Sequence, residues 1–148
     1  MKMLCAWLGV LLGTVAAVLG WSSPAIADEY RTPATPGAEV YFIAPQDQST
    51  VDSTFSVKFG LKEMGVAPAG TDTAGTGHHH LLIDLDTLPD LDESLPATDH
   101  IKHFGAGQTE TTLTLPPGEH TLQLLLANYV HIPHDPPVIS DKITVAVE

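Results

Sequence analysis

The chain has 148 residues with six basic and 18 acidic side chains, a formal net charge of −12 at pH 7, and one cysteine. This acidity disfavours nucleic acid and anionic membrane surfaces as partners and favours cations. Because the lone Cys5 falls in the signal peptide predicted below, the mature protein is expected to have no disulfide, thiolate nucleophile or sulfur-ligated metal site.

Residues 1–27 are typical of a secretory signal peptide. They place Lys2 before an apolar run and end in small residues, with cleavage expected after Ala27. A retained membrane anchor is the less favoured alternative, because the apolar run is barely long enough to span a bilayer. We therefore expect a periplasmic or secreted protein that begins at Asp28 and has no stable membrane insertion.

The next segments change from an extended leader to β-strand patterns. Residues 28–37 contain two prolines and no apolar period, which favours an extended leader. Residues 38–45 and 53–61 are predicted strands, and the second alternates apolar and polar side chains, as a strand with one face on a core does. The Gly-, Ala- and Thr-rich residues 65–77 predict a loop, and residues 78–85, "HHHLLIDL", predict a third strand.

The second half begins with a long segment without a period. Residues 87–108 contain two prolines and several acids, and loops of this length in small domains are usually functional or mobile. Residues 109–115 and 119–128 are predicted strands joined by a tight Pro-Pro-Gly turn. The loop 129–137 then leads to a last strand within 138–147, and no segment has a sustained helical period.

These patterns predict one all-β domain over residues 38–148. About six to seven short strands with turns between them are typical of an immunoglobulin-like antiparallel β-sandwich. A small β-barrel is the alternative.

Eight histidines are grouped rather than scattered. They are His78, His79 and His80 in the triplet, His100 and His103 in one HxxH, His131 and His134 in a second, and the isolated His120. Residues two apart on a strand share a face, so His78 and His80 should lie together, roughly 6.5–7 Å apart, with His79 on the opposite side. The triplet alone therefore cannot supply three ligands to one ion.

The order of the strands predicts a larger cluster. If consecutive strands alternate in direction, the start of the His78 strand, the segment before residue 109 and the loop after residue 128 all lie at one end of the domain. His120 then lies at the opposite end, at the start of its strand. Seven of the eight histidines could thus converge.

Imidazole donors suit a late first-row divalent ion, and we expect Cu(II) or Zn(II). The predicted ligands are His78, His80, His103, His131 and His134, with secondary candidates His79, His100, Asp84 and Glu110. The two carboxylates could complete the coordination or orient an imidazole. A Cu(I) site is disfavoured and a blue-copper site excluded, because the mature chain lacks a thiolate. Singly, each histidine is more often hydrogen-bonded to backbone than metal-bound, and His79 and His120 fit that interpretation best.

Four motifs, "GHHHLLID", "HFGAGQTE", "PPGEHTLQLLLAN" and "HIPHDPPVISDKITV", resemble the bacterial exported family catalogued as domain of unknown function 4399. The resemblance runs from Gly77 to Val147. It implies an exported single-domain protein of immunoglobulin-like fold, and it implies no activity.

Three functions remain open from the sequence. The leading hypothesis is an exported, non-enzymatic β-sandwich that binds Cu(II) or Zn(II) for metal handling or buffering. The first alternative is an immunoglobulin-like envelope or interaction module without metal, in which the histidines would form no cluster. The second is a metal-dependent hydrolase or dismutase with Glu110 or Asp84 as base, although the sequence has no HExxH motif.

Overall fold

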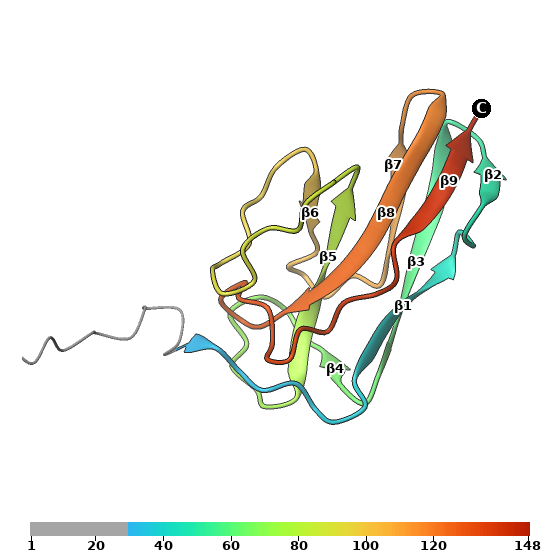
Figure 1. Cartoon of the computed structure of the whole chain (residues 1–148). Helices are drawn as coiled ribbons and strands as arrows, with labels where there is room; N and C mark the ends of the chain where they lie inside the picture. The colour runs from blue at the N-terminus through green and yellow to red at the C-terminus, as the bar shows by residue number, and fades with distance from the viewer. Residues whose placement is uncertain (1–29) are drawn as a thin grey trace, which may run out of the picture.

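Two β-sheets face each other in the computed structural model, which describes residues 30–148 (Figure 1). The strands are β1 (Glu39–Ala44), β2 (Ser49–Val51), β3 (Thr54–Lys62), β4 (Gly65–Val66), β5 (Thr76–Ile83), β6 (Ile101–His103), β7 (Glu110–Thr114), β8 (Gly118–Ala127) and β9 (Ile143–Val147). The all-β sandwich expected from the sequence is confirmed, and three very short strands, β2, β4 and β6, add to those predicted. The predicted signal peptide, 1–27, lies outside the described residues.

The first sheet has the order β1-β3-β7, with both pairings antiparallel. Its central strand alternates as the sequence predicts, because Phe55, Val57 and Phe59 are buried while Ser56 and Lys58 are exposed. In the described part of the chain there is no helix long and apolar enough to cross a membrane.

The second sheet has the order β2-β9-β8-β5-β4, and β6 also pairs with β5. Its long pairings, β5 with β8 and β8 with β9, are antiparallel as expected. The short edge strands β2 and β4 instead run parallel to β9 and β5. The sheet is therefore mixed at its margins and antiparallel at its centre.

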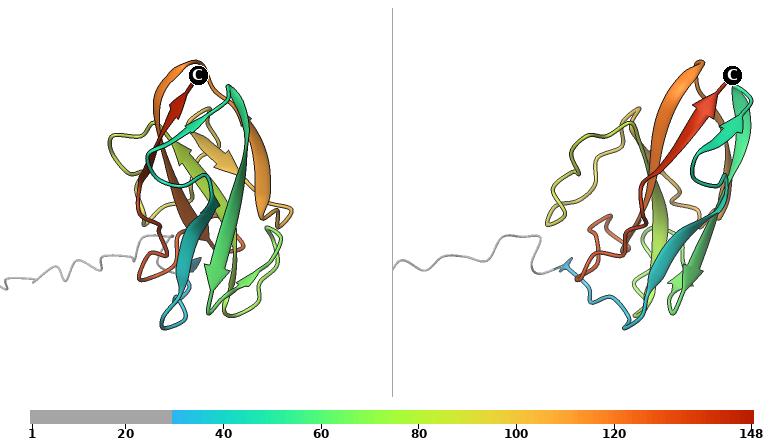
Figure 2. Two further views of the ribbon diagram at one scale, coloured as in Figure 1. Left: turned by 90° about the vertical axis from the view of Figure 1, so that its right-hand side faces the viewer. Right: turned by 45° about the vertical axis from the view of Figure 1, so that its right-hand side comes forward.

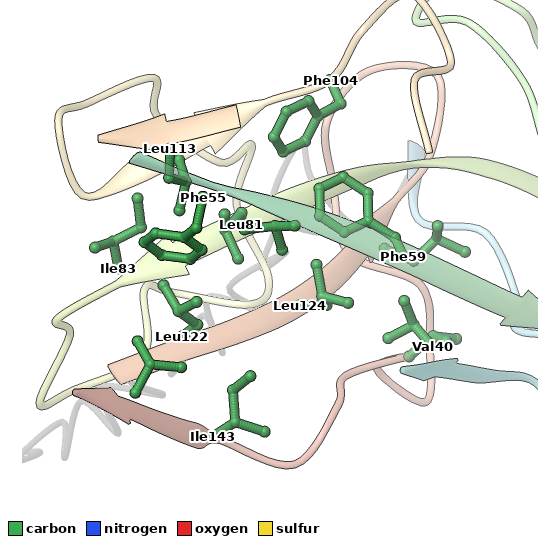
Figure 3. Close-up of a cluster of buried hydrophobic side chains, with 14 of the residues drawn as sticks. Val40, Phe55, Phe59, Leu81, Ile83, Phe104, Leu113, Leu122, Leu124 and Ile143 are labelled. Atoms are coloured by element: carbon green, nitrogen blue, oxygen red, sulfur yellow. The ribbon is translucent and has the colours of Figure 1, made fainter. Parts of the chain in front are cut away.

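The main core fills the space between the two sheets (Figure 3). Leu81 and Ile83 of β5 and Leu122 and Leu124 of β8 point into it, and Phe59 of β3 meets them from the first sheet. Each such side chain contributes about 1.5–3 kcal/mol by leaving water. These contacts fix which face of β5 points inward.

The outward face of β5 is buried as well. Leu82 packs with Leu125 and Ala127 of β8. It also packs with Leu95 and Ile101 from residues 87–108, for which the sequence predicts no regular structure. Figure 2 shows this segment and the chain after β8 on the outer side of the second sheet. Burial on both faces explains why β5 has a continuous apolar run. The strand β6 within the segment has only three residues, too few for a recognisable period.

Candidate metal centre

Four imidazoles gather on the outward face of the second sheet. They belong to His78 and His80 of β5, His103 of β6 and His131 of the loop after β8. All six pairs of ring centroids lie between 4.6 and 6.1 Å apart. The four rings, called here the imidazole cluster, therefore surround one point.

Strand register brings the imidazole cluster together. His80 is directly opposite His103 in the antiparallel pairing of β5 with β6, and His78 lies two residues earlier on the same face. His78 in turn pairs with Ala127, the last residue of β8. The loop that leaves β8 consequently begins beside His78, which is why His131 can reach the other three rings.

Three of the four rings have nitrogens close enough together for one ion, and the fourth ring has a nitrogen beside one of these. One nitrogen each from His78, His80 and His103 lie within 4.8 Å of one another. The Nε2 atoms of His131 and His103 are 3.1 Å apart. A tetrahedral zinc ion with bonds of 2.0–2.1 Å separates its ligand atoms by about 3.3 Å, so modest ring rotations would complete the coordination.

His78 and His80 are fully enclosed yet have no hydrogen-bond partners. Their exposed fractions are 0 and 1%, and all four of their ring nitrogens are buried without a partner. A buried polar group left in this state costs about 1–3 kcal/mol, and native proteins rarely retain one without a reason. By contrast, His103 is exposed and His131 half-buried, so the cluster has an enclosed floor and an open rim.

The surroundings of His78, His80 and His103 favour the neutral form of these three imidazoles. Burial, and then repulsion from neighbouring imidazoles, lowers the pKa of His78 to about 4 and that of His80 to about 3. Burial and the nearby His131 also lower the pKa of His103. Neutral imidazole is the form that binds metal ions, and no carboxylate belongs to the group.

Two glycines leave room for histidine rings. A Cβ atom at Gly105 would lie 2.5 Å from Nε2 of His103, and closer still to Cε1. A Cβ atom at Gly77 would lie 2.8 Å from Nε2 of His134 and 2.7 Å from the Ala127 carbonyl oxygen. Neither glycine was predicted to shape the site, although both lie within two residues of a candidate histidine.

Three other predicted histidines lie outside the imidazole cluster. His79 faces the core, as strand parity predicts, with its ring centroid 5.2 Å from that of Phe59. The Nδ1 atom of His100 is 2.9 Å from the Ile83 carbonyl oxygen. His134 is buried, and its Nδ1 atom is 2.9 Å from Oγ1 of Thr32. Of the seven histidines expected to converge, the structure thus brings together four.

The two predicted carboxylates also lie elsewhere. Asp84 contacts Nδ1 of His120 at 2.7 Å and accepts a hydrogen bond from the Thr121 amide. This contact raises the pKa of His120. Glu110 is exposed and 3.9 Å from Lys58. His120 is therefore a structural residue at the far end of β8, as the strand-order argument requires, and Asp84 lies there with it.

Fold and site together define an all-β sandwich with a histidine group that could hold a metal ion. The chain belongs to the family described as Domain of unknown function (DUF4399), which matches residues 57–148 and includes the entire imidazole cluster. The resemblance seen in the four sequence motifs is thereby confirmed.

Comparison with individual proteins adds no function. No curated protein matches the chain significantly. Among solved structures, the endo-β-1,4-mannanase from Thermotoga petrophila is similar, with 22% sequence identity and a TM-score of 0.42. That similarity covers 75% of this chain but only 20% of the mannanase, so the chain spans about a fifth of that protein.

Proposed function

We propose that this protein binds a divalent transition metal ion, Cu(II) or Zn(II), through His78, His80, His103 and His131. Its role is metal handling or buffering in the periplasm or outside the cell. The proposal keeps four of the five ligands predicted from the sequence and leaves out His134, whose Nδ1 atom lies 2.9 Å from Oγ1 of Thr32.

The observation that carries the proposal is a pair of enclosed imidazoles without partners, His78 and His80, that face two further imidazoles. The nitrogens of His79 also lack partners, but that ring faces Phe59 in the core. Water does not reach the ring nitrogens of His78 and His80, and no protein group hydrogen-bonds to them. A bound ion would take up one nitrogen of each ring and return the lost interaction energy. Two further imidazoles at the open rim would complete the coordination and provide a path for the ion.

The donor set favours Cu(II) and Zn(II) over other ions. All four donors are imidazole nitrogens, which suit borderline divalent ions, whereas Mg²⁺ and Ca²⁺ prefer oxygen. Four imidazoles also satisfy a tetrahedral ion without a carboxylate. An ion held in this way keeps its full positive charge, which the acidic protein as a whole offsets.

Both alternative functions receive less support. An interaction module without metal predicts histidines that form no cluster, and four of them surround one point. A hydrolase needs a base beside the metal, but the two candidates, Asp84 and Glu110, contact His120 and Lys58 instead. Metal storage or transfer requires neither a base nor a substrate cleft.

The direct test uses the full chain, expressed without an affinity tag and recovered from the periplasm. Elemental analysis of that material, followed by chelator-competition titration with Cu(II) and Zn(II), measures binding, and N-terminal sequencing tests cleavage before Asp28. We expect one ion per chain. The double variant His103→Ala with His131→Ala removes only the rim ligands and should weaken binding at least about 100-fold.

The matched control is the double variant His100→Ala with His120→Ala, which removes two imidazoles outside the cluster. It should bind metal as tightly as the wild type. Absence of binding in the wild type, or equal losses in both double variants, would contradict the proposal.

A further inference from the structure

We propose that Asn128 is the positioning residue of the metal centre, because its side chain shapes the turn that presents His131. This inference rests on the metal-binding function proposed above. It assigns a role to a buried side chain that coordinates nothing itself, and it explains how a loop residue becomes a fixed ligand.

Asn128 closes a five-residue turn around His131. It is 1% exposed and follows the last residue of β8. Its Oδ1 atom accepts hydrogen bonds from the amides of Val130 at 3.0 Å and Ile132 at 3.1 Å. The backbone N–H of Asn128 donates to the Ile132 carbonyl at 2.9 Å, and the backbone carbonyl of Asn128 accepts from the His131 N–H at 3.0 Å. Four hydrogen bonds thus tie one residue to the three that follow Tyr129.

The side-chain Nδ2 atom of Asn128 hydrogen-bonds to the predicted leader, residues 28–37. This atom donates to the Tyr30 carbonyl at 2.7 Å and lies 3.4 Å from Oγ1 of Thr32. The leader itself is fixed alongside the same loop, since the Asp135 amide donates to the Thr32 carbonyl at 3.0 Å. The side chain therefore needs an acceptor on one side and a donor on the other. Only an amide supplies both at this length.

The turn holds His131 in a backbone conformation that is unfavourable for a residue with a side chain. Its φ is +69°, in the left-handed region, which costs a residue with a Cβ atom about 1–2 kcal/mol. The Leu95 amide donates to the His131 carbonyl at 2.9 Å, so a second segment supports the same conformation. Without the Asn128 hydrogen bonds we expect the backbone to relax and the imidazole to leave the cluster.

A preorganised ligand raises affinity because little freedom is lost when the ion binds. Metal–ligand distances tolerate changes of only about 0.2 Å. If the turn relaxes, we therefore expect His131 to stop coordinating the ion rather than to coordinate it slightly more weakly. Asn128→Ala should therefore mimic His131→Ala at the metal, although the imidazole is still present in the chain.

The test measures Cu(II) affinity and the number of coordinating imidazole nitrogens by electron paramagnetic resonance, with Cu(II) as the probe and the full chain recovered from the periplasm. We expect Asn128→Ala to lower affinity about 10–100-fold and to remove one nitrogen from the spectrum. Combined with His131→Ala, it should add no further loss. Asn128→Asp keeps the acceptor for the Val130 and Ile132 amides but loses the donor to the Tyr30 carbonyl, so it should lower the free energy of unfolding and still retain all four nitrogens in the folded protein.

Ser140→Ala is the matched control, because it removes a buried side-chain acceptor for the Leu124 amide far from His131. It should lower stability without changing the copper spectrum.

The inference is overturned if Asn128→Ala keeps four nitrogens and full affinity, if its effect adds to that of His131→Ala, or if Asn128→Asp loses the fourth nitrogen. The aspartate variant keeps the side-chain volume and so decides the question even where the alanine variant does not fold. A wild type that binds neither copper nor zinc overturns both proposals, whereas a wild type that binds metal with an unaffected Asn128→Ala variant, or that binds zinc but not copper, overturns only this one.

Discussion

A methyl group at position 105 should displace one metal ligand without unfolding the protein. In Gly105→Ala the new Cβ atom would lie 2.5 Å from Nε2 of His103, whereas ordinary contacts begin at 3.4 Å. The ring must therefore move by about 1 Å. Since His103 is exposed, its imidazole can rotate outward, and we expect the free energy of unfolding of the metal-free protein to change by less than about 0.5 kcal/mol.

That displacement exceeds the tolerance of a metal–nitrogen bond several-fold, so His103 should cease to coordinate. We expect metal affinity to fall about 10–100-fold, which corresponds to about 1.4–2.8 kcal/mol of binding free energy. Competition titration of Zn(II) or Cu(II) against a chromophoric chelator measures the affinity. Urea unfolding of the metal-free protein measures the stability.

A double-variant cycle separates displacement from other causes. Once His103→Ala has removed the ring, Gly105→Ala has nothing left to displace and should cost no further affinity. Unchanged binding in the single variant would refute the reasoning, as would a full additional loss in the His103→Ala background.

Three further predictions concern stability, measured as urea unfolding of the metal-free protein. Burial lowers the pKa of His79 to about 4, so the unfolded chain binds protons more readily below pH 6.5 and acid destabilises the fold. His79→Leu should reduce the stability lost between pH 7.5 and pH 5.0 by about 2 kcal/mol, and an unaltered loss would contradict this. The hydrogen bond that His120 donates to the Asp84 carboxylate raises the pKa of His120, so its contribution is complete below pH 6.5 and disappears as pH rises through the raised value. His120→Gln should accordingly differ more from the wild type at pH 5.5 than at pH 9, and the reverse order would count against the pairing. Leu124→Ala, at a fully buried core position, should cost about 2–5 kcal/mol, and a cost below 1 kcal/mol would show that the main core is assigned wrongly.

Strand parity and strand direction account for what could be predicted from the sequence. The period of two separates His78 and His80 from His79, and the antiparallel order of β5 and β8 places His120 at the far end. Both inferences need only the regular geometry of a sheet, which applies to any residue at those positions. The central strands β3, β5 and β8 were predictable for the same reason.

The rest of the site depends on irregular backbone, for which no periodic rule exists. His103 belongs to the short strand β6, and nothing in its sequence distinguishes it from His100 three residues earlier. His131 and His134 are equivalent by spacing, but the left-handed turn closed by Asn128 directs only the first toward the cluster. Asp84, by contrast, could have been excluded from the site by strand direction, because it follows the end of β5 and the antiparallel pairing places it beside the start of β8.

Under the proposed metal binding, the double burial of β5 would link metal supply to the lifetime of the protein. One backbone carries Leu81 and Ile83 into the main core and His78 and His80 toward the proposed ion. Loss of the ion would leave unpartnered polar atoms on β5, the strand that contributes side chains to both hydrophobic clusters. Local unfolding of β5 would then cost less free energy. We expect cellular proteases to clear the metal-free protein faster than the loaded one, which a pulse-chase comparison in metal-depleted and metal-replete cells can measure. Protein abundance would then follow the availability of the ion without any change in synthesis.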